Sequence, residues 1–270
     1  MSGLTFTLRH APDQRLDLSG LTASRLAGLG TAAIAALPIG TTRAGLKVGD
    51  IFAVTGDDVA DIRFVGGSER FDRIGERHAE GSILVEGDVG QRAGRAMTGG
   101  TLEIRGSAGP FAGSGLSGGM LTITGDAGDD LGGPLAGEMA GLRGGTVNVL
   151  GAVGARAGNR MRRGTILVGG AAGQHAGARM IAGTLVVGGK AARGAGTLMK
   201  RGTIILAGGA DATGPTFVDN GPADLLILRL MAKAFAVAPF PDALFDGSPM
   251  RRLAGDTAVS GMGEILLPLG

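Results

Sequence analysis

Seven short stretches of the chain alternate aliphatic residues with polar or small ones, and glycine brackets each stretch. In GTLEIRG, residues 100–106, Leu102 and Ile104 flank Glu103. Alternation with a period of two puts Leu102 and Ile104 on one face of a strand and Glu103 on the other. The opening glycines are 19, 19, 26, 19, 19 and 19 residues apart: Gly81, Gly100, Gly119, Gly145, Gly164, Gly183 and Gly202. A period of this kind predicts a solenoid of stacked units.

The length of the repeat distinguishes two kinds of solenoid. Helical repeats need about 33 or more residues, whereas 19 residues with glycines at the corners suit one coil of a parallel β-helix. Equivalent residues of successive coils then stack about 4.8 Å apart. The pattern therefore predicts an all-β fold, a right-handed parallel β-helix with small capping segments that include helices.

The repeats divide the chain into three regions. Residues 1–60 are predicted to form an N-terminal capping segment, residues 61–212 the β-helix, and residues 213–270 a C-terminal capping helix and tail. A cap is expected because an open end of the solenoid exposes unpaired backbone groups. Within the first two regions we expect strands at 4–8 and 47–55, helices that begin near Thr22 and Thr31 with these threonines as caps, and a degenerate first coil at 62–67.

The C-terminal region carries one predicted helix, residues 223–236, with Pro222 in its first turn. This segment is apolar nearly all round, which predicts that it is buried over the last coil or along the flank of the solenoid. The apolar tail at 265–269 is a candidate for docking on the body or on a neighbour.

Composition offers few groups for catalysis. The chain has no Cys and only three His, which lie in unrelated segments, so we expect lone surface histidines and no metal site. The single GxSxG sequence places Ser117 before a predicted strand, which is not the strand–turn–helix setting of a nucleophile elbow. We predict no catalytic residue in this chain. Neither a signal peptide nor a run long enough to span a membrane is apparent, so a cytoplasmic location and no membrane contact are expected.

Charge is distributed unevenly along the repeats. Between Glu138 and Asp211 there is no Asp or Glu, whereas ten Lys and Arg residues lie in that interval. Several of them recur at the repeat spacing, so like charges stack, which points to an acidic ligand or an acidic partner surface; an ordinary solvated face is the alternative. No aromatic residues are interleaved for base stacking, which argues against nucleic acid. The candidate binding residues are Arg156, Arg160, Arg162, Arg163, His175, Arg179, Lys200 and Arg201.

The same coils carry an apolar stripe at the outward position of the strand, formed by Leu167, Val186 and Ile205. Such a stripe needs a cover, which is either the C-terminal helix or another subunit, and we take it as a candidate partner-facing surface. The 26-residue interval contains seven extra residues around 134–140, which predict a projecting loop. A binding role for this loop and a tolerated surface insertion are both open.

Both the repeat and its flanks resemble a known family. The coils at 162–180 (RRGTILVGGAAGQHAGARM) and 200–214 resemble the C-terminal domain of the large glutamate synthase subunit. With the lead-in at 15–52 and the exit at 215–235 (PTFVDNGPADLLILRLMAKAF), the chain is still more similar to the C subunit of formylmethanofuran dehydrogenase. The resemblance implies a non-catalytic β-helix subunit of a hetero-oligomer, in which amidohydrolase-like and formyltransferase subunits carry the chemistry.

Within this family, a composition rich in Ala, Gly and Arg favours the bacterial formyltransferase/hydrolase complex over the archaeal complexes with molybdenum or tungsten pterin and iron–sulfur centres. The resemblance implies formyl transfer between tetrahydromethanopterin and a methanofuran-like carrier, with release of formate. It also implies that a methanofuran- or methylofuran-type carrier is bound through its acidic tail, with no covalent cofactor and no metal in this chain.

Two other functions stay open at this point. One is a structural β-helix domain that serves a glutamate-synthase-like amidotransferase. The other is a stand-alone acyltransferase of the left-handed β-helix class, which would show a six-residue period and a catalytic His; neither is evident here.

Overall fold

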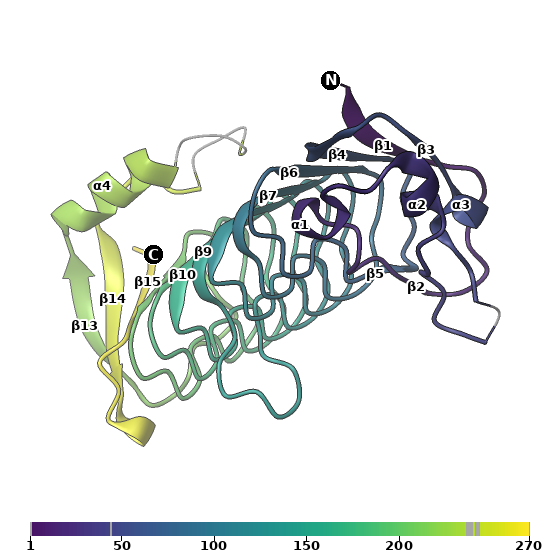
Figure 1. Cartoon of the computed structure of the whole chain (residues 1–270). Helices are drawn as coiled ribbons and strands as arrows, with labels where there is room; N and C mark the ends of the chain where they lie inside the picture. The colour runs from purple at the N-terminus through teal and green to yellow at the C-terminus, as the bar shows by residue number, and fades with distance from the viewer. Residues whose placement is uncertain (1, 44, 236–239, 241–243, 270) are drawn as a thin grey trace.

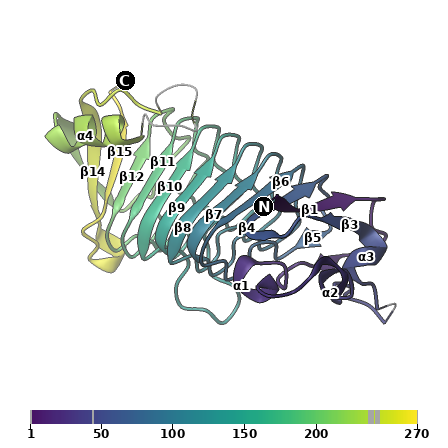
Figure 2. The ribbon, with the colours of Figure 1, turned by 45° about the horizontal axis from the view of Figure 1, so that its top comes forward.

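The computed structural model describes residues 2–43, 45–235, 240 and 244–269. It confirms an all-β, mostly parallel solenoid. One sheet of 13 strands runs the length of the molecule, in the order β13-β14-β15-β12-β11-β10-β9-β8-β7-β6-β4-β1-β3. Figures 1 and 2 show the coils stacked side by side, with the N-terminal elements over one end and the C-terminal elements over the other.

The strands of successive coils pair in the register that the repeat predicts. Ile166 pairs with Val147 of the preceding coil and with Leu185 of the next. The predicted degenerate first coil is present, because β4 pairs in parallel with β6. A second face of each coil is linked by single parallel bridges through Ser68, Val89, Ala108, Ala127, Val153, Ala172, Ala191 and Ala210. The strands of the coils are β4 (Asp58–Val65), β5 (Phe71–Asp72), β6 (Ser82–Glu86), β7 (Thr98–Ile104), β8 (Gly118–Ile123), β9 (Arg143–Val149), β10 (Arg163–Val168), β11 (Thr184–Val187) and β12 (Thr203–Leu206).

The core is a narrow aliphatic column inside the coils, as the alternation predicts. The two inward positions of each strand are fully buried, from Ile83 and Val85 to Ile204 and Leu206. A further buried column lies at the corner shortly before each strand and is formed by Met97, Leu116, Leu142, Met161, Met180 and Met199.

His78 corrects the expectation of lone surface histidines. Its side chain is 1% exposed, because it takes the first place in the column that Met97 continues one coil later. Its Nε2 lies 3.2 Å from the carbonyl oxygen of Gly81, and Nδ1 has no hydrogen-bond partner among the described residues. Burial lowers the pKa of His78, although the hydrogen bond to Gly81 and the charge of Glu80 act in the opposite direction.

The N-terminal cap differs in detail from the prediction. Residues 48–51 form a helix and not a strand, because the carboxylate of Asp50 accepts a hydrogen bond from the backbone N–H of Lys47 (2.8 Å) and closes a helical turn. Thr22 precedes a helix but makes no side-chain cap bond, and Gly30 rather than Thr31 is the cap of the next helix. The elements are β1 (Gly3–Leu8), β2 (Leu16–Asp17), α1 (Ala23–Leu26), α2 (Thr31–Ala35), α3 (Val48–Ile51) and β3 (Phe52–Thr55).

The C-terminal region continues the sheet and then covers its flank. β15 pairs in parallel with β12, so the apolar tail docks on the body. Pro222 lies in an edge strand opposite Arg251, and the helix therefore starts at Leu226 and not at residue 223. The helix is amphipathic and not buried all round, because Leu228 is buried whereas Leu226 is 66% exposed. The elements are β13 (Phe217–Ala223), α4 (Leu226–Phe235), β14 (Met250–Asp256), η1 (Thr257–Val259) and β15 (Glu264–Pro268).

Candidate functional site

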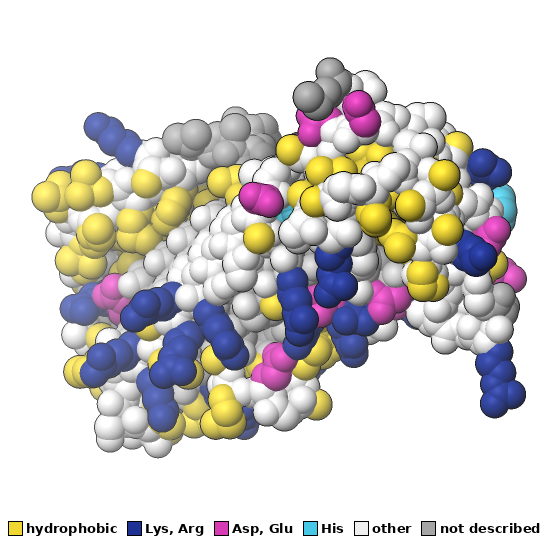
Figure 3. All heavy atoms as spheres, in the orientation of Figure 1, with side chains coloured by type: hydrophobic (Ala, Val, Ile, Leu, Met, Phe, Trp, Pro, Cys, Tyr) yellow, Lys and Arg dark blue, Asp and Glu magenta, His cyan; other side chains and the backbone are white. Residues whose placement is uncertain are grey.

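Four of the predicted binding residues lie at one corner of successive coils. Arg156, Arg160, His175 and Arg179 all have left-handed backbones, with φ of 61°, 50°, 61° and 53°. Left-handed residues other than glycine are uncommon, and here the sharp corner repeats them in successive coils. Figure 3 shows Lys and Arg side chains gathered over the C-terminal half of the solenoid, on the flank below α4 in that view. We call the eight predicted binding residues the basic face: Arg156, Arg160, Arg162, Arg163, His175, Arg179, Lys200 and Arg201.

A cavity of 250 Å³ lies within the basic face. It brings together three of the predicted residues, Arg156, His175 and Arg179, whereas the other five do not line it. The remaining lining residues, which the sequence reasoning missed, are Asn159, Ala178, Thr197 and Leu198. A signal for them was present, because Asn159, Ala178 and Thr197 recur at the 19-residue spacing.

Arg156 has a carboxylate partner of its own. Its Nε and Nη2 donate to the two carboxylate oxygens of Asp130 at 2.9 and 2.6 Å, and Asp129 lies 3.9 Å away. This paired hydrogen bonding raises the pKa of Arg156. Arg156 therefore already has an anionic partner within the chain. The charge that remains for a ligand in the cavity comes from Arg179.

A glycine in the next coil allows the ring of His175 to lie where it does. Gly194 occupies the place that follows His175 in its column, with φ +85°. A Cβ added at Gly194 would lie 2.5 Å from Nδ1 of His175. Any larger residue there would displace the ring from the cavity, so Gly194 is a supporting residue of this site.

The other members of the basic face are free of carboxylates in the part of the chain that the structure describes. Arg160 is half-buried and donates from Nη1 to the carbonyl oxygen of Glu138 at 3.3 Å. Nearby, Lys190 pairs with Asp211 at 2.6 Å, and this hydrogen bond lowers the pKa of Asp211. The exposed members without such a partner are Arg162, Arg163, His175, Arg179, Lys200 and Arg201.

The apolar stripe does not face a partner, so the prediction that Leu167, Val186 and Ile205 form a partner-facing surface is wrong. Leu167 is 5% exposed and Val186 and Ile205 are 0% exposed. The chain's own C-terminal region covers them, because they form one cluster with Leu228, Phe240, Phe245, Met250 and Leu266. Of the two covers that the sequence allowed, the structure shows the intramolecular one.

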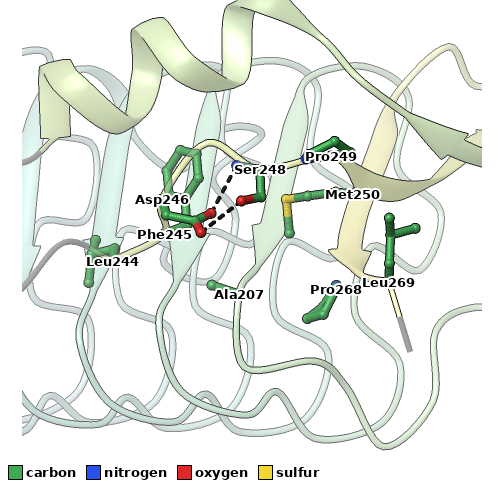
Figure 4. A pocket seen from close by; sticks show the side chains of 9 residues that line it. All are labelled: Ala207, Leu244, Phe245, Asp246, Ser248, Pro249, Met250, Pro268 and Leu269. Carbon is green, nitrogen blue, oxygen red and sulfur yellow. Dashed lines mark hydrogen bonds between the residues drawn. The ribbon is translucent and has the colours of Figure 1, made fainter.

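A larger cavity of 520 Å³ lies beside this cover (Figure 4). Its walls are mostly apolar, and its polar part is Asp246, whose carboxylate accepts hydrogen bonds from the backbone N–H (2.8 Å) and the hydroxyl (2.7 Å) of Ser248. These bonds lower the pKa of Asp246. None of the predicted binding residues lines this cavity. The lining residues are Ala207, Leu244, Phe245, Asp246, Ser248, Pro249, Met250, Pro268 and Leu269.

The described residues contain no group of three His, Cys, Asp or Glu side chains that could hold a metal ion. Ser117 of the GxSxG sequence donates to the carbonyl oxygen of Met97 at 3.3 Å and leads directly into a strand. In the same part of the chain, no helix is long and apolar enough to cross a membrane.

Comparisons with known proteins agree with one another. No family model matches the chain. The chain is 46% identical over 88 residues to the C subunit of the formyltransferase/hydrolase complex Fhc of Methylorubrum extorquens strain AM1, and the aligned stretch spans 33% of each protein. It is also 44% identical, with a TM-score of 0.93, to a chain in the crystal structure of the formyltransferase/hydrolase complex (FhcABCD) from Methylorubrum extorquens in complex with methylofuran. That alignment covers 98% of this chain and 100% of the other.

Proposed function

The chain belongs to the family of the C subunits of formyltransferase/hydrolase complexes, and from this we propose that it is the non-catalytic β-helix subunit of such a complex. The observation that carries the proposal is the extent of the match, which includes the repeats and both caps. A subunit with the same caps and the same coils presents the same shape to its neighbours.

In the proposed complex, other subunits carry out the chemistry. Amidohydrolase-like and formyltransferase subunits pass a formyl group between tetrahydromethanopterin and a methanofuran-like carrier and release formate in the cytoplasm. This chain supplies a rigid scaffold. The solved relative was crystallised with methylofuran, which supports a carrier of that type.

We assign the basic face to the acidic tail of the carrier, or to an acidic surface of a sister subunit that presents the tail. Arginine binds carboxylates through paired donors, and Arg179 and Arg160 lack carboxylate partners among the described residues. Exposed ion pairs each contribute about 0–1 kcal/mol. Several of them must therefore act together, which a row of cations at the coil spacing allows.

The test uses the assembled complex, purified through a tag on this chain. Mass spectrometry identifies the co-purifying proteins and the retained carrier. In the double variant Arg160→Gln/Arg179→Gln we expect weaker retention of the carrier or of a partner subunit at low salt. The difference from the unmodified chain should become smaller as salt rises, because salt screens the charges that the unmodified chain uses. The matched control is Arg9→Gln/Arg25→Gln, which removes the same charge from exposed residues near the N-terminal end.

The outcomes separate the two assignments. An intact complex that loses its carrier favours a tail site, whereas dissociation favours an interface between subunits. If the double variant behaves like its control at physiological salt, the basic face is ordinary solvated surface. If no formyltransferase or amidohydrolase-like protein co-purifies with the unmodified chain, the proposed function itself is wrong.

A further inference from the structure

The insertion in the third repeat interval forms a loop that projects from the row of coils (Figures 1 and 2). It leaves the solenoid after Gly133 and returns at Gly141. The return is fixed on two sides, because the N–H of Gly141 donates to the carbonyl oxygen of Arg160 (3.0 Å) and that of Leu142 donates to Gly132 (2.7 Å). The base of the loop is therefore part of the rigid scaffold.

A single residue, Glu138, holds the shape of the loop. Its carboxylate accepts hydrogen bonds from the backbone N–H of Leu135 (3.0 Å) and from the guanidinium of Arg95, which lies on an earlier coil. Its own N–H donates to the carbonyl oxygen of Leu135 at 3.0 Å, and its carbonyl oxygen accepts from Arg160 at 3.3 Å. Because the loop is already ordered, binding through it loses little conformational entropy.

This ordered loop presents an apolar side chain to solvent. Met139 follows Glu138 directly and is 79% exposed, the highest value for a large apolar side chain in the described part of the chain. One exposed apolar residue alone indicates nothing. An exposed methionine next to the residue that fixes the loop is different, because thioether side chains adapt well to the pockets of protein partners.

The charge around the base indicates the chemistry of the partner. The carboxylate of Glu138 is already engaged by Arg95. Arg143, Arg160 and Arg162 lie at the base, and none of them has a carboxylate partner among the described residues. We propose that the loop 134–140 is a preformed docking element that inserts Met139 into an apolar pocket, rimmed by carboxylates, on another subunit of the complex. This inference rests on the proposed function.

The test compares Met139→Asp with Met262→Asp in the co-expressed complex. Met262 is a matched control, because it is 70% exposed and lies between β14 and β15. Both variants of the full chain alone should melt like the unmodified chain, since neither side chain is buried. For Met139→Asp we expect binding of the partner subunit to weaken by at least about tenfold, as loss of a buried methionine implies. Met262→Asp should retain the partner. Glu138→Ala, which keeps Met139 but frees the loop, should give a smaller loss.

Equal retention of the partner by Met139→Asp and Met262→Asp would overturn the inference while leaving the proposed function intact. A chain that self-associates alone, and does so less as Met139→Asp, would show that the loop contacts a second copy of this chain and not another subunit. Absence of any co-purifying subunit would overturn the inference together with the proposed function.

Discussion

Two adjacent valines of β11 allow both sides of the strand to be tested by the same change, valine to aspartate. Val187 points into the coil, where it stacks between Val168 and Leu206. Val186 points outwards, yet it is equally buried, at 0% exposure, because the C-terminal region covers it. We expect Val187→Asp and Val186→Asp to fail in different ways.

The cost of Val187→Asp follows from its position inside the coil, where no cation or water can reach the carboxylate without opening the solenoid. To protonate a carboxyl of ordinary pKa at pH 7 costs about 4 kcal/mol. Loss of the buried valine adds about 1.5–3 kcal/mol, and unpaired polar atoms add about 1–3 kcal/mol. The sum, about 7–10 kcal/mol, is comparable with the whole stability of a typical domain, about 5–15 kcal/mol. Soluble folded protein should therefore not accumulate.

In Val186→Asp the new carboxylate can become hydrated without opening the solenoid, which is not possible in Val187→Asp. If α4 leaves the flank, the new carboxylate reaches water, so the cost is limited to the free energy of undocking the cover. The solenoid should persist, while Arg229 and Lys233 on α4 become better sites for trypsin.

Circular dichroism melting and limited trypsin digestion measure the two effects. Thr122→Asp is the control, because Thr122 takes the same outward position on an earlier coil and is only half-buried. It should melt within a few degrees of the unmodified chain, as surface substitutions usually do. Unchanged melting of Val187→Asp would mean that the inside and outside of the strand are reversed. Loss of the solenoid in Val186→Asp, without selective cleavage in α4, would mean that the cover is wrongly assigned.

Two further predictions concern single positions. The pKa of His78 is lowered from 6.5 by burial, so below about pH 6.5 the unfolded chain binds a proton that the folded chain does not, and stability falls as pH decreases. His78→Met introduces the residue type that Met97 supplies at the same place one coil later, and its urea midpoint should change less between pH 7.5 and 5.5 than that of the unmodified chain. An equal change in the two proteins would contradict this prediction. In Gly177→Ala the new Cβ would lie 2.4 Å from Cδ1 of Ile204 at φ +69°, which should lower the free energy of unfolding by about 2–5 kcal/mol through strain and overpacking. The control Gly209→Ala, with φ +77° and nothing within 4 Å of the new Cβ, should lower it by only about 1–2 kcal/mol in urea unfolding. Equal losses would show that the contact with Ile204 is unimportant.

The repeat alone was enough to predict which residues stack. In a parallel solenoid, each coil is the previous one moved by one repeat, so spacing in sequence becomes adjacency in space. The inward positions of every strand, the first coil and the meeting of Arg156 with His175 follow from this rule. The same rule implied one contact that we did not predict from the sequence. Asp130 and Arg156 are 26 residues apart, the length of the one long interval, and they pair directly.

Features outside the repeat depended on tertiary structure. The helix start at Leu226, the short helix closed by Asp50 and the burial of Val186 all involve segments with no counterpart in another coil. The sequence showed that the apolar stripe needs a cover, since exposed aliphatic residues in a row are unfavourable in water. It did not show which surface supplies the cover, because that depends on the fit of a C-terminal region that becomes adjacent to the stripe only when the chain is folded.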